Sequence, residues 1–205
     1  LRKSLKPLGD MERLTNRVVS RTANPRDLGA ILTNLLQIPD LKNLVASQTL
    51  SSVVKDIDAA PDIVNLLQSV LIDDPPANID RSGFIRPSSS PELDKIIKSS
   101  KHALDWISEL ETIERERTTI KSLKVGFNKV FGYFIEVTKS SQGQVPDEYI
   151  RKQTLVNAER YITPELKEYE NIVLDAEEKM LAIERDIFTK LCAEVSKQAD
   201  RLLKC

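Results

Sequence analysis

The chain has 205 residues, with 30 Lys and Arg against 31 Asp and Glu, which gives a formal net charge of −1 at pH 7. Hydrophobic residues make up 40% of the chain, aromatic residues make up 5%, and there are six glycines, a composition typical of a helix-rich protein with little sheet. The longest uncharged stretches have 12 residues. A membrane-spanning helix needs about 20 apolar residues, so we expect none.

The chain does not open with a basic segment followed by an apolar run, so we expect no signal peptide. Cys192 and Cys205 fall in what reads as one helix. At 1.5 Å per residue they would lie about 20 Å apart, too far for a disulfide bond. Unpaired cysteines favour a reducing compartment.

Residues 1–90 predict several short helices. Asn24 and Pro25 form a helix start, and helices are also predicted over residues 10–20, 40–46 and 61–72. Residues 73–91 contain four prolines and a serine run, which indicate a crossover connection. Within it, residues 83–86 (Gly-Phe-Ile-Arg) indicate a packed segment. The apolar side chains that follow Pro25 at helical spacing are Leu28, Ile31, Leu32, Leu35 and Leu36.

Two long helices are the clearest predicted elements. Ser90 and Thr163 are suited to cap helices whose first residues are Pro91 and Pro164, and the predicted helices extend over residues 91–117 and 163–205. With about 45 residues between them, they are expected to form an antiparallel pair. Each helix is predicted to pack through one face, called its seam. The first seam consists of Leu93, Ile97, Ser100, Leu104, Ile107 and Glu111, widened by Trp106, Leu110 and Ile113. The second, a near-heptad, consists of Leu166, Tyr169, Val173, Ala176, Met180, Ile183 and Ile187.

Between the two long helices the hydrophobic period changes from 3.6 to 2, which predicts strands. Residues 123–128 and 133–138 form a predicted hairpin that turns through Gly132, and residues 153–158 supply another strand. The predicted fold is mainly α with a small antiparallel β-sheet, inserted at the tip of the long helix pair. The predicted core of the sheet is Leu123, Val125, Phe127, Ile135 and Val137.

The residues give no support for catalysis. No Gly-x-x-x-x-Gly-Lys-Ser/Thr loop is present, and Cys192, Cys205 and His102 are too few for a Cys/His zinc site. The carboxylate pairs lie in charged helices and are best explained as solvated faces. We expect no enzyme active site, no metal and no cofactor in this chain.

The net charge is unevenly distributed. Residues 121–160 carry +3, whereas residues 1–90 carry +1, residues 91–120 carry −2 and residues 161–205 carry −3. Two interpretations stay open: a surface for DNA phosphates, or strand-edge lysines that prevent aggregation. The candidate phosphate contacts are Lys124, Asn128, Lys129, Arg151, Lys152, Gln153, Asn157 and Arg160.

Several long segments closely resemble the MutS family of DNA mismatch-repair proteins. Residues 114–118, 122–138 and 145–170 resemble its clamp region, and residues 9–13, 23–28, 84–87 and 91–94 resemble its core, or lever, domain. The resemblance implies a lever domain over residues 1–120, a β-rich clamp over residues 121–162 and a returning lever helix over residues 163–205. Thr119 departs from it, because many members have glycine there.

The resemblance implies that the clamp grips the backbone of duplex DNA without sequence preference and transmits its position through the lever helices. The mismatch-reading domain, with its Phe-x-Glu motif, and the ATPase domain have no counterpart here, so we expect a fragment. For the full-length protein, the resemblance implies ATP and Mg, mismatched double-stranded DNA, a homodimer, a MutL-type partner and a bacterial cytoplasmic, nucleoid-associated location. The alternative is a structural coiled-coil interaction module that pairs two chains through the second seam.

Overall fold

The computed structural model describes residues 5–6, 8–45 and 57–204. Its contacts divide the chain into two compact units. The first unit, called the helical unit, contains the residues up to Asp94 together with those from Met180 onward. The second, called the sheet unit, is the continuous segment Lys95–Lys179. No helix of the described residues combines the length and apolar character needed to cross a membrane.

The helical unit contains α2 (Met11–Val19), α3 (Pro25–Val45), α5 (Pro61–Val70), the later part of α7 (Pro164–Ser196) and α8 (Ala199–Leu202). Asp10 caps α2, because its Oδ1 atom accepts a hydrogen bond from the Arg13 N–H at 2.9 Å. The short helices predicted at residues 10–20 and 61–72 are confirmed. Apolar side chains that the sequence places on one face of each helix form the buried core, among them Leu14, Val18, Leu28, Ile31, Leu35 and Leu67.

One helix predicted near residue 40 is not a separate element. α3 continues through Pro39 to Val45, and Ala46, the last residue of the predicted piece, lies outside the described residues. A proline inside a helix removes one backbone hydrogen bond. Here Leu35 and Ile38, in the helical turn before the proline, are buried, so core packing holds the helix together across it.

The predicted packed segment in the crossover is confirmed. Phe84 is fully buried, its ring meets that of Phe188 edge-on at 6.1 Å, and Ile85 pairs with Leu71 in an isolated β-bridge. Gly83 has φ +104°, a backbone conformation that favours glycine. The short 3₁₀ helix η1 (Pro87–Ser89) then leads into α6 (Pro91–Thr118).

The carboxylate of Glu184 ties this crossover segment to α7. Glu184 is 1% exposed, and its two oxygens accept hydrogen bonds from the Gly83 N–H at 2.9 and 2.8 Å. Its Oε2 also accepts one from the Phe84 N–H at 3.1 Å. A single helix side chain thereby satisfies backbone donors of a segment about 100 residues away in sequence.

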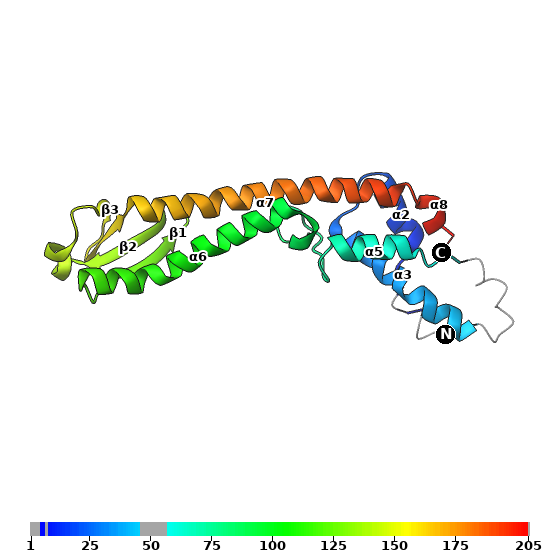
Figure 1. The fold of residues 1–205 in the computed structure, drawn as a ribbon, viewed down its shortest axis with the longest axis horizontal. Helices are drawn as coiled ribbons and strands as arrows, with labels where there is room; N and C mark the ends of the chain where they lie inside the picture. Colours follow the sequence, from blue (N-terminus) through cyan, green and yellow to red (C-terminus); the bar gives the residue numbers. More distant parts are fainter. Residues whose placement is uncertain (1–4, 7, 46–56, 205) are drawn as a thin grey trace. The chain divides into compact units, whose positions relative to one another are not determined.

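The sheet unit contains a four-stranded antiparallel sheet that lies between the two long helices in sequence (Figure 1). The strands are β1 (Lys124–Asn128), β2 (Gly132–Thr138), β3 (Ile150–Thr154) and β4 (Ala158–Ile162), in the order β1-β2-β4-β3, with the 3₁₀ helix η2 (Lys139–Gln144) after β2. This arrangement confirms the predicted fold class. The single strand predicted at residues 153–158 was wrong, because residues 153–154 end β3, residues 155–157 form a turn and Ala158 begins β4.

Within the sheet unit, α6 and α7 run antiparallel. Both predicted caps are confirmed, that of α6 in the helical unit and that of α7 in the sheet unit. Ser90 Oγ and Thr163 Oγ1 accept hydrogen bonds from the backbone N–H groups of Leu93 and Leu166, at 3.3 and 3.0 Å. Trp106 of α6 stacks on Tyr169 of α7, with ring centroids 4.0 Å apart. Leu166 and Val173 share one core cluster with Ala103, Ile107 and Leu110. This part of the second seam is therefore filled within one chain.

The predicted seams are shifted by one residue in places. In α6, Ala103 is buried and Leu104 is 42% exposed, and Ile113 is exposed beside the buried Glu114. In α7, the buried positions after Ala176 are Glu184, Phe188, Leu191 and Val195, whereas Met180, Ile183 and Ile187 are only partly buried. Buried glutamates occupy positions that an apolar pattern cannot identify.

The predicted helix over residues 163–205 is interrupted. α7 ends at Ser196, and α8 begins at Ala199 after a tight turn in which the Gln198 N–H donates to the Val195 carbonyl. The turn lets Leu202 enter the core and lets Arg201 form ion pairs with Asp58 and Asp62, at 2.8 and 2.9 Å. Cys205 lies outside the described residues.

The end of α6 explains why glycine suits position 119. Thr119 has φ +61°, a left-handed conformation that costs a side-chain-bearing residue roughly 1–2 kcal/mol. We expect Thr119→Gly to raise the free energy of unfolding by about 0.5–1 kcal/mol, because the greater freedom of glycine in the unfolded chain offsets part of this gain. Chemical denaturation measures the change. Thr119→Ala is the control, since it removes the hydroxyl but keeps the strained Cβ, and an equal gain there would contradict the explanation.

A second prediction concerns Glu184. Glu184→Leu keeps an apolar stem but leaves the N–H groups of Gly83 and Phe84 unpaired, so we expect the free energy of unfolding to fall by about 1–3 kcal/mol. Glu178→Leu is the matched control, because Glu178 is exposed on the same helix. A surface change of this kind is expected to stay within about 0.5 kcal/mol.

The loss in Glu184→Leu should also depend on pH. Burial raises the pKa of Glu184 above its ordinary value of 4.5. A raised folded-state pKa contributes stability that is fully present below the unfolded-state pKa and is lost as the pH rises through the folded-state pKa. Denaturation at several pH values should therefore show a larger gap between wild type and variant below pH 4.5 than at neutral pH. A constant gap would contradict this account.

Candidate nucleic-acid interface

The register of the sheet places its side chains on two faces. Val125 pairs with Ile135 and Phe127 pairs with Tyr133, so these four side chains share the face that packs against the helices, called the inner face. Lys124 and Asn128 lie on the opposite, outer face, as predicted. Leu123, Ile135 and Val137 are buried as expected, and Val125 is partly buried. Phe127 was wrongly predicted as core: it is 57% exposed and contacts Tyr133 at the sheet edge.

Three segments meet at one end of the sheet, called the lysine end: residues 119–124, 138–144 and 154–158. The Ser122 hydroxyl donates to Ser141 Oγ at 3.2 Å, and the Thr138 hydroxyl donates to Ser122 Oγ at 2.9 Å. The backbone N–H of Lys139 donates to the Asn157 carbonyl at 3.1 Å. These bonds hold a cluster of hydroxyl groups between the turns.

The three segments of the lysine end carry positive charge and no acid of their own, and the nearby buried Glu159 of β4 interacts electrostatically with Lys139. The segments contain Lys121, Lys124 and Lys139 and no Asp or Glu. All three lysines are exposed, and none lies close enough to a carboxylate of the described residues to form an ion pair. The other basic residues of the +3 segment include Arg151 and Arg160, which pair with Glu159 and Glu136. The unpaired positive charge of the segment is therefore carried by its lysines, three of which lie at the lysine end.

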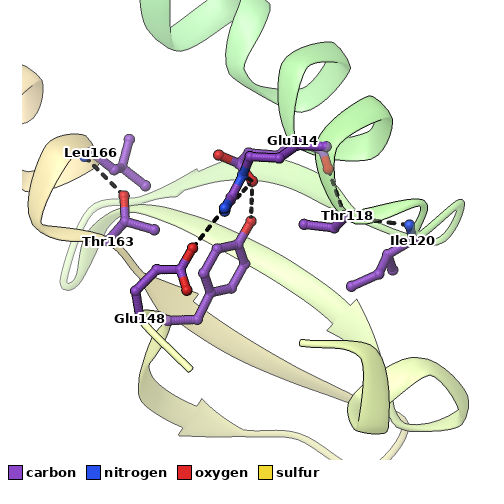
Figure 2. A network of polar contacts seen from close by, with 8 residues as sticks. Glu114, Thr118, Ile120, Glu148, Thr163 and Leu166 are labelled. Carbon is purple, nitrogen blue, oxygen red and sulfur yellow. Dashed lines mark hydrogen bonds and ion pairs between the residues drawn. The ribbon is translucent and has the colours of Figure 1, made fainter. Parts of the chain in front are cut away.

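A buried carboxylate anchors the connection from α6 into the lysine end (Figure 2). Glu114 is 7% exposed and accepts hydrogen bonds from the Tyr149 hydroxyl at 2.7 Å and from the Arg117 Nε–H at 2.9 Å. Arg117 also pairs with Glu148 at 2.6 Å and thereby lowers the pKa of that carboxyl. Burial, followed by the bond to Glu114, raises the pKa of Tyr149, so the tyrosine remains a neutral donor.

The main chain beyond this carboxylate is fixed as well. The Thr118 hydroxyl donates to the Glu114 carbonyl at 2.6 Å and accepts from the Ile120 N–H at 3.3 Å. Ile120 is fully buried, so residues 118–120 turn the chain from helix to strand in one defined path (Figure 2).

A second buried carboxylate, Glu159 of β4, holds η2 against the sheet. It is 4% exposed and accepts hydrogen bonds from the Tyr161 hydroxyl at 2.5 Å and from the Gln142 amide at 3.0 Å. The bond from Tyr161, with help from Arg151, lowers the pKa of Glu159. Burial and the bond to Glu159 raise the pKa of Tyr161 to about 12. Both groups thus keep their roles as acceptor and donor at neutral pH.

On the outer face, Arg160 covers an aromatic ring. Its guanidinium lies 4.1 Å from the centroid of Phe134 and is held by Glu136 at 2.8 Å and by the Gln153 side-chain oxygen at 3.0 Å. Beneath the ring, a Cβ atom at Gly126 would lie 2.8 Å from Phe134. Glycine is therefore required in β1 to make room for the aromatic side chain.

The eight predicted phosphate contacts do not form one surface. Lys124 and Asn157 belong to the lysine end, whereas Asn128 and Lys129 lie at the β1–β2 turn. Lys152, Gln153 and Arg160 line a hollow on the outer face. Arg151 pairs across the sheet with Tyr161, on the inner face, and its side chain contacts Glu159.

The predicted phosphate contacts do not include Lys121, Lys139 or the hydroxyl groups of the lysine end. One signal for them was present in the sequence: residues 119–124 and 138–144 contain lysines and no Asp or Glu. Only the fold shows that these stretches are neighbours. Among the described residues, no three His, Cys, Asp or Glu side chains gather as metal ligands would.

Comparison of the sequence with known proteins relates this chain to one family. Residues 88–179 match the model described as MutS family domain IV, and this range contains the whole sheet unit. The chain is also similar to proteins named DNA mismatch repair protein MutS. It is 47% identical to that of Salinibacter ruber over 201 residues and 45% identical to that of Ruminiclostridium cellulolyticum over 204 residues. With that of Methanothrix thermoacetophila it shares 47% identity over 194 residues.

These matches cover most of this chain and a small part of each relative. They include 97%, 98% and 92% of the chain, but 22%, 23% and 23% of the respective relatives. The chain therefore spans less than a quarter of the length of these three proteins.

The packing of Phe134 on Gly126 gives a prediction. In Gly126→Ala the new methyl group must displace the ring, so we expect the free energy of unfolding to fall by about 1–3 kcal/mol. Gly143→Ala is the matched control, because a Cβ atom at Gly143 would meet nothing within 4 Å. Thermal or chemical denaturation compares the two variants, and equal stabilities would contradict the proposed close packing.

Proposed function

The chain belongs to the MutS family, and we propose that its sheet unit is a clamp that contacts the phosphate backbone of duplex DNA through the lysine end. The observation that carries this proposal is the position of Lys121, Lys124 and Lys139. They are exposed at one end of the sheet, on two segments that contain no Asp or Glu. Unpaired cations of this kind attract phosphates and release the counterions bound to DNA.

The polar groups around these lysines suit the same partner. The hydroxyls of Ser122, Thr138 and Ser141 lie between the lysine-bearing turns, and Asn157 is exposed beside Lys139. Hydroxyl and amide groups contribute short hydrogen bonds to phosphate oxygens and fix the position of the duplex. No part of this arrangement reads base edges, so the contact would be independent of sequence.

The longer protein is a further part of the proposal. The relatives are named for DNA mismatch repair, and we propose that a full-length protein containing this chain binds mismatched duplex DNA. There the long helices would transmit clamp position to an ATPase domain that uses ATP and Mg, in a homodimer with a MutL-type partner. Residues 1–120 and 163–205 would form the lever and residues 121–162 the clamp.

The lysine end can be tested by reversing charges. Lys121→Glu combined with Lys139→Glu should weaken binding of this chain to a short DNA duplex and reduce its salt dependence. Each phosphate contact contributes about 0.9 to the slope of log affinity against log salt, so we expect the slope to fall by roughly 2. Fluorescence anisotropy at several NaCl concentrations measures both quantities, and two unrelated duplex sequences should give the same result.

The chain offers a control with the same change in charge. Lys129→Glu combined with Lys152→Glu alters lysines outside the lysine end, and we expect its salt slope to stay close to that of the wild type. Equal weakening by both double variants would mean that DNA responds to total charge alone, and the lysine end would then not be the contact site. The bacterial or archaeal source of the relatives does not affect this test.

A further inference from the structure

The outer face of the sheet has a hollow near the β1–β2 turn that the DNA proposal does not use. It has a volume of about 240 Å³ and is lined by Val130, Phe131, Phe134, Lys152, Arg160 and Lys167, with Gln153 and Ile162. Val130 is 81% exposed and Phe131 is 51% exposed. An antiparallel sheet normally turns a polar face to water, so large apolar side chains here require an explanation.

The floor of the hollow is rigid. Phe134 is held between Gly126 and the guanidinium of Arg160, and Arg160 is in turn fixed by Glu136 and Gln153. Gly132, with φ +79°, closes the turn directly above Glu170 of α7. A site whose walls are fixed in advance loses less conformational entropy when a partner binds.

The rim of the hollow is cationic. Lys152 is exposed and has no carboxylate partner among the described residues, and Lys129 lies in the adjoining turn with the same property. Lys167 of α7 is 47% exposed at its side chain and pairs with the buried Glu170 at 3.2 Å. An apolar centre surrounded by charged side chains is typical of protein–protein interfaces.

We propose that this hollow is a docking site for an acidic segment of another protein that carries one large apolar side chain. The apolar side chain would lie against Phe131 and Phe134, and the flanking carboxylates would pair with Lys129 and Lys152. A DNA duplex fits less well, because phosphates and sugars gain nothing from the exposed Val130 and Phe131. The site lies apart from the lysine end, and the proposal does not depend on DNA binding.

The test uses the whole chain and fluorescein-labelled peptides of the form acetyl-Glu-Asp-Xaa-Asp-Glu, with Leu, Phe, Trp or Ala at Xaa. Burial of one large apolar side chain should make at least one of the first three peptides bind about tenfold or more tightly than the Ala peptide. Phe131→Ser and Lys152→Glu should each remove this preference, as measured by fluorescence anisotropy. Both side chains are exposed, and thermal unfolding checks that the variants remain folded.

Matched controls come from other parts of the sheet unit. Phe127→Ser removes an exposed phenylalanine on the inner face, and Lys139→Glu reverses a charge at the lysine end, so both should leave peptide binding unchanged. An unlabelled duplex should not displace the peptide. The proposal is overturned if no apolar residue improves on Ala, or if the controls weaken binding equally. It is also overturned if the duplex displaces the peptide and Phe131→Ser weakens DNA binding, which would assign the hollow to DNA.

Discussion

Buried carboxylates hold together the parts of this protein that its apolar core does not reach. A four-stranded sheet with two helices on one face has a small core, and its long connections cannot all enter it. Glu114 and Glu159 bind tyrosine hydroxyls and neighbouring side chains, and Glu184 binds backbone N–H groups of the crossover segment. Each of these groups would cost free energy if it were buried without its partners. The fold of the connections therefore depends on a few fully satisfied acids.

This use of carboxylates also determines the surface charge. Glu136 and Glu159 are paired within the sheet with Arg160 and Arg151, and Glu148 is paired with Arg117. The acids of the segment are largely engaged in structural bonds, while lysines at the two ends of the sheet are left without partners. A chain with a formal net charge of −1 thereby presents a local surface of opposite sign. The two arginines, which look most suited to phosphates in the sequence, instead maintain the sheet.

The sequence predicted the helices, their caps and the first hairpin, because apolar periodicity and capping residues are local signals. It missed β4 and most of β3, since Ile150–Thr154 and Ala158–Ile162 are rich in charged and polar residues that pair with each other across the strands. The seam shifts at Leu104 and after Ala176 have a similar cause, because the burial of Glu114 and Glu184 is decided by partners distant in sequence. Charge counting over the sequence identifies residues 121–160 as the basic segment, but side-chain partners decide which of its cations remain unpaired.

The order of the units along the chain has a consequence for biosynthesis. The helical unit is discontinuous: it needs residues up to Asp94 and residues from Met180 onward, and Glu184 must be present to receive the N–H groups of Gly83 and Phe84. On a ribosome, the N-terminal part must wait while the entire sheet unit is translated. The sheet unit is continuous and can fold first, which reverses the usual N-terminal-first order of cotranslational folding. During that interval Phe84 lacks the ring of Phe188, its final packing partner, so the nascent chain exposes apolar surface until α7 is complete.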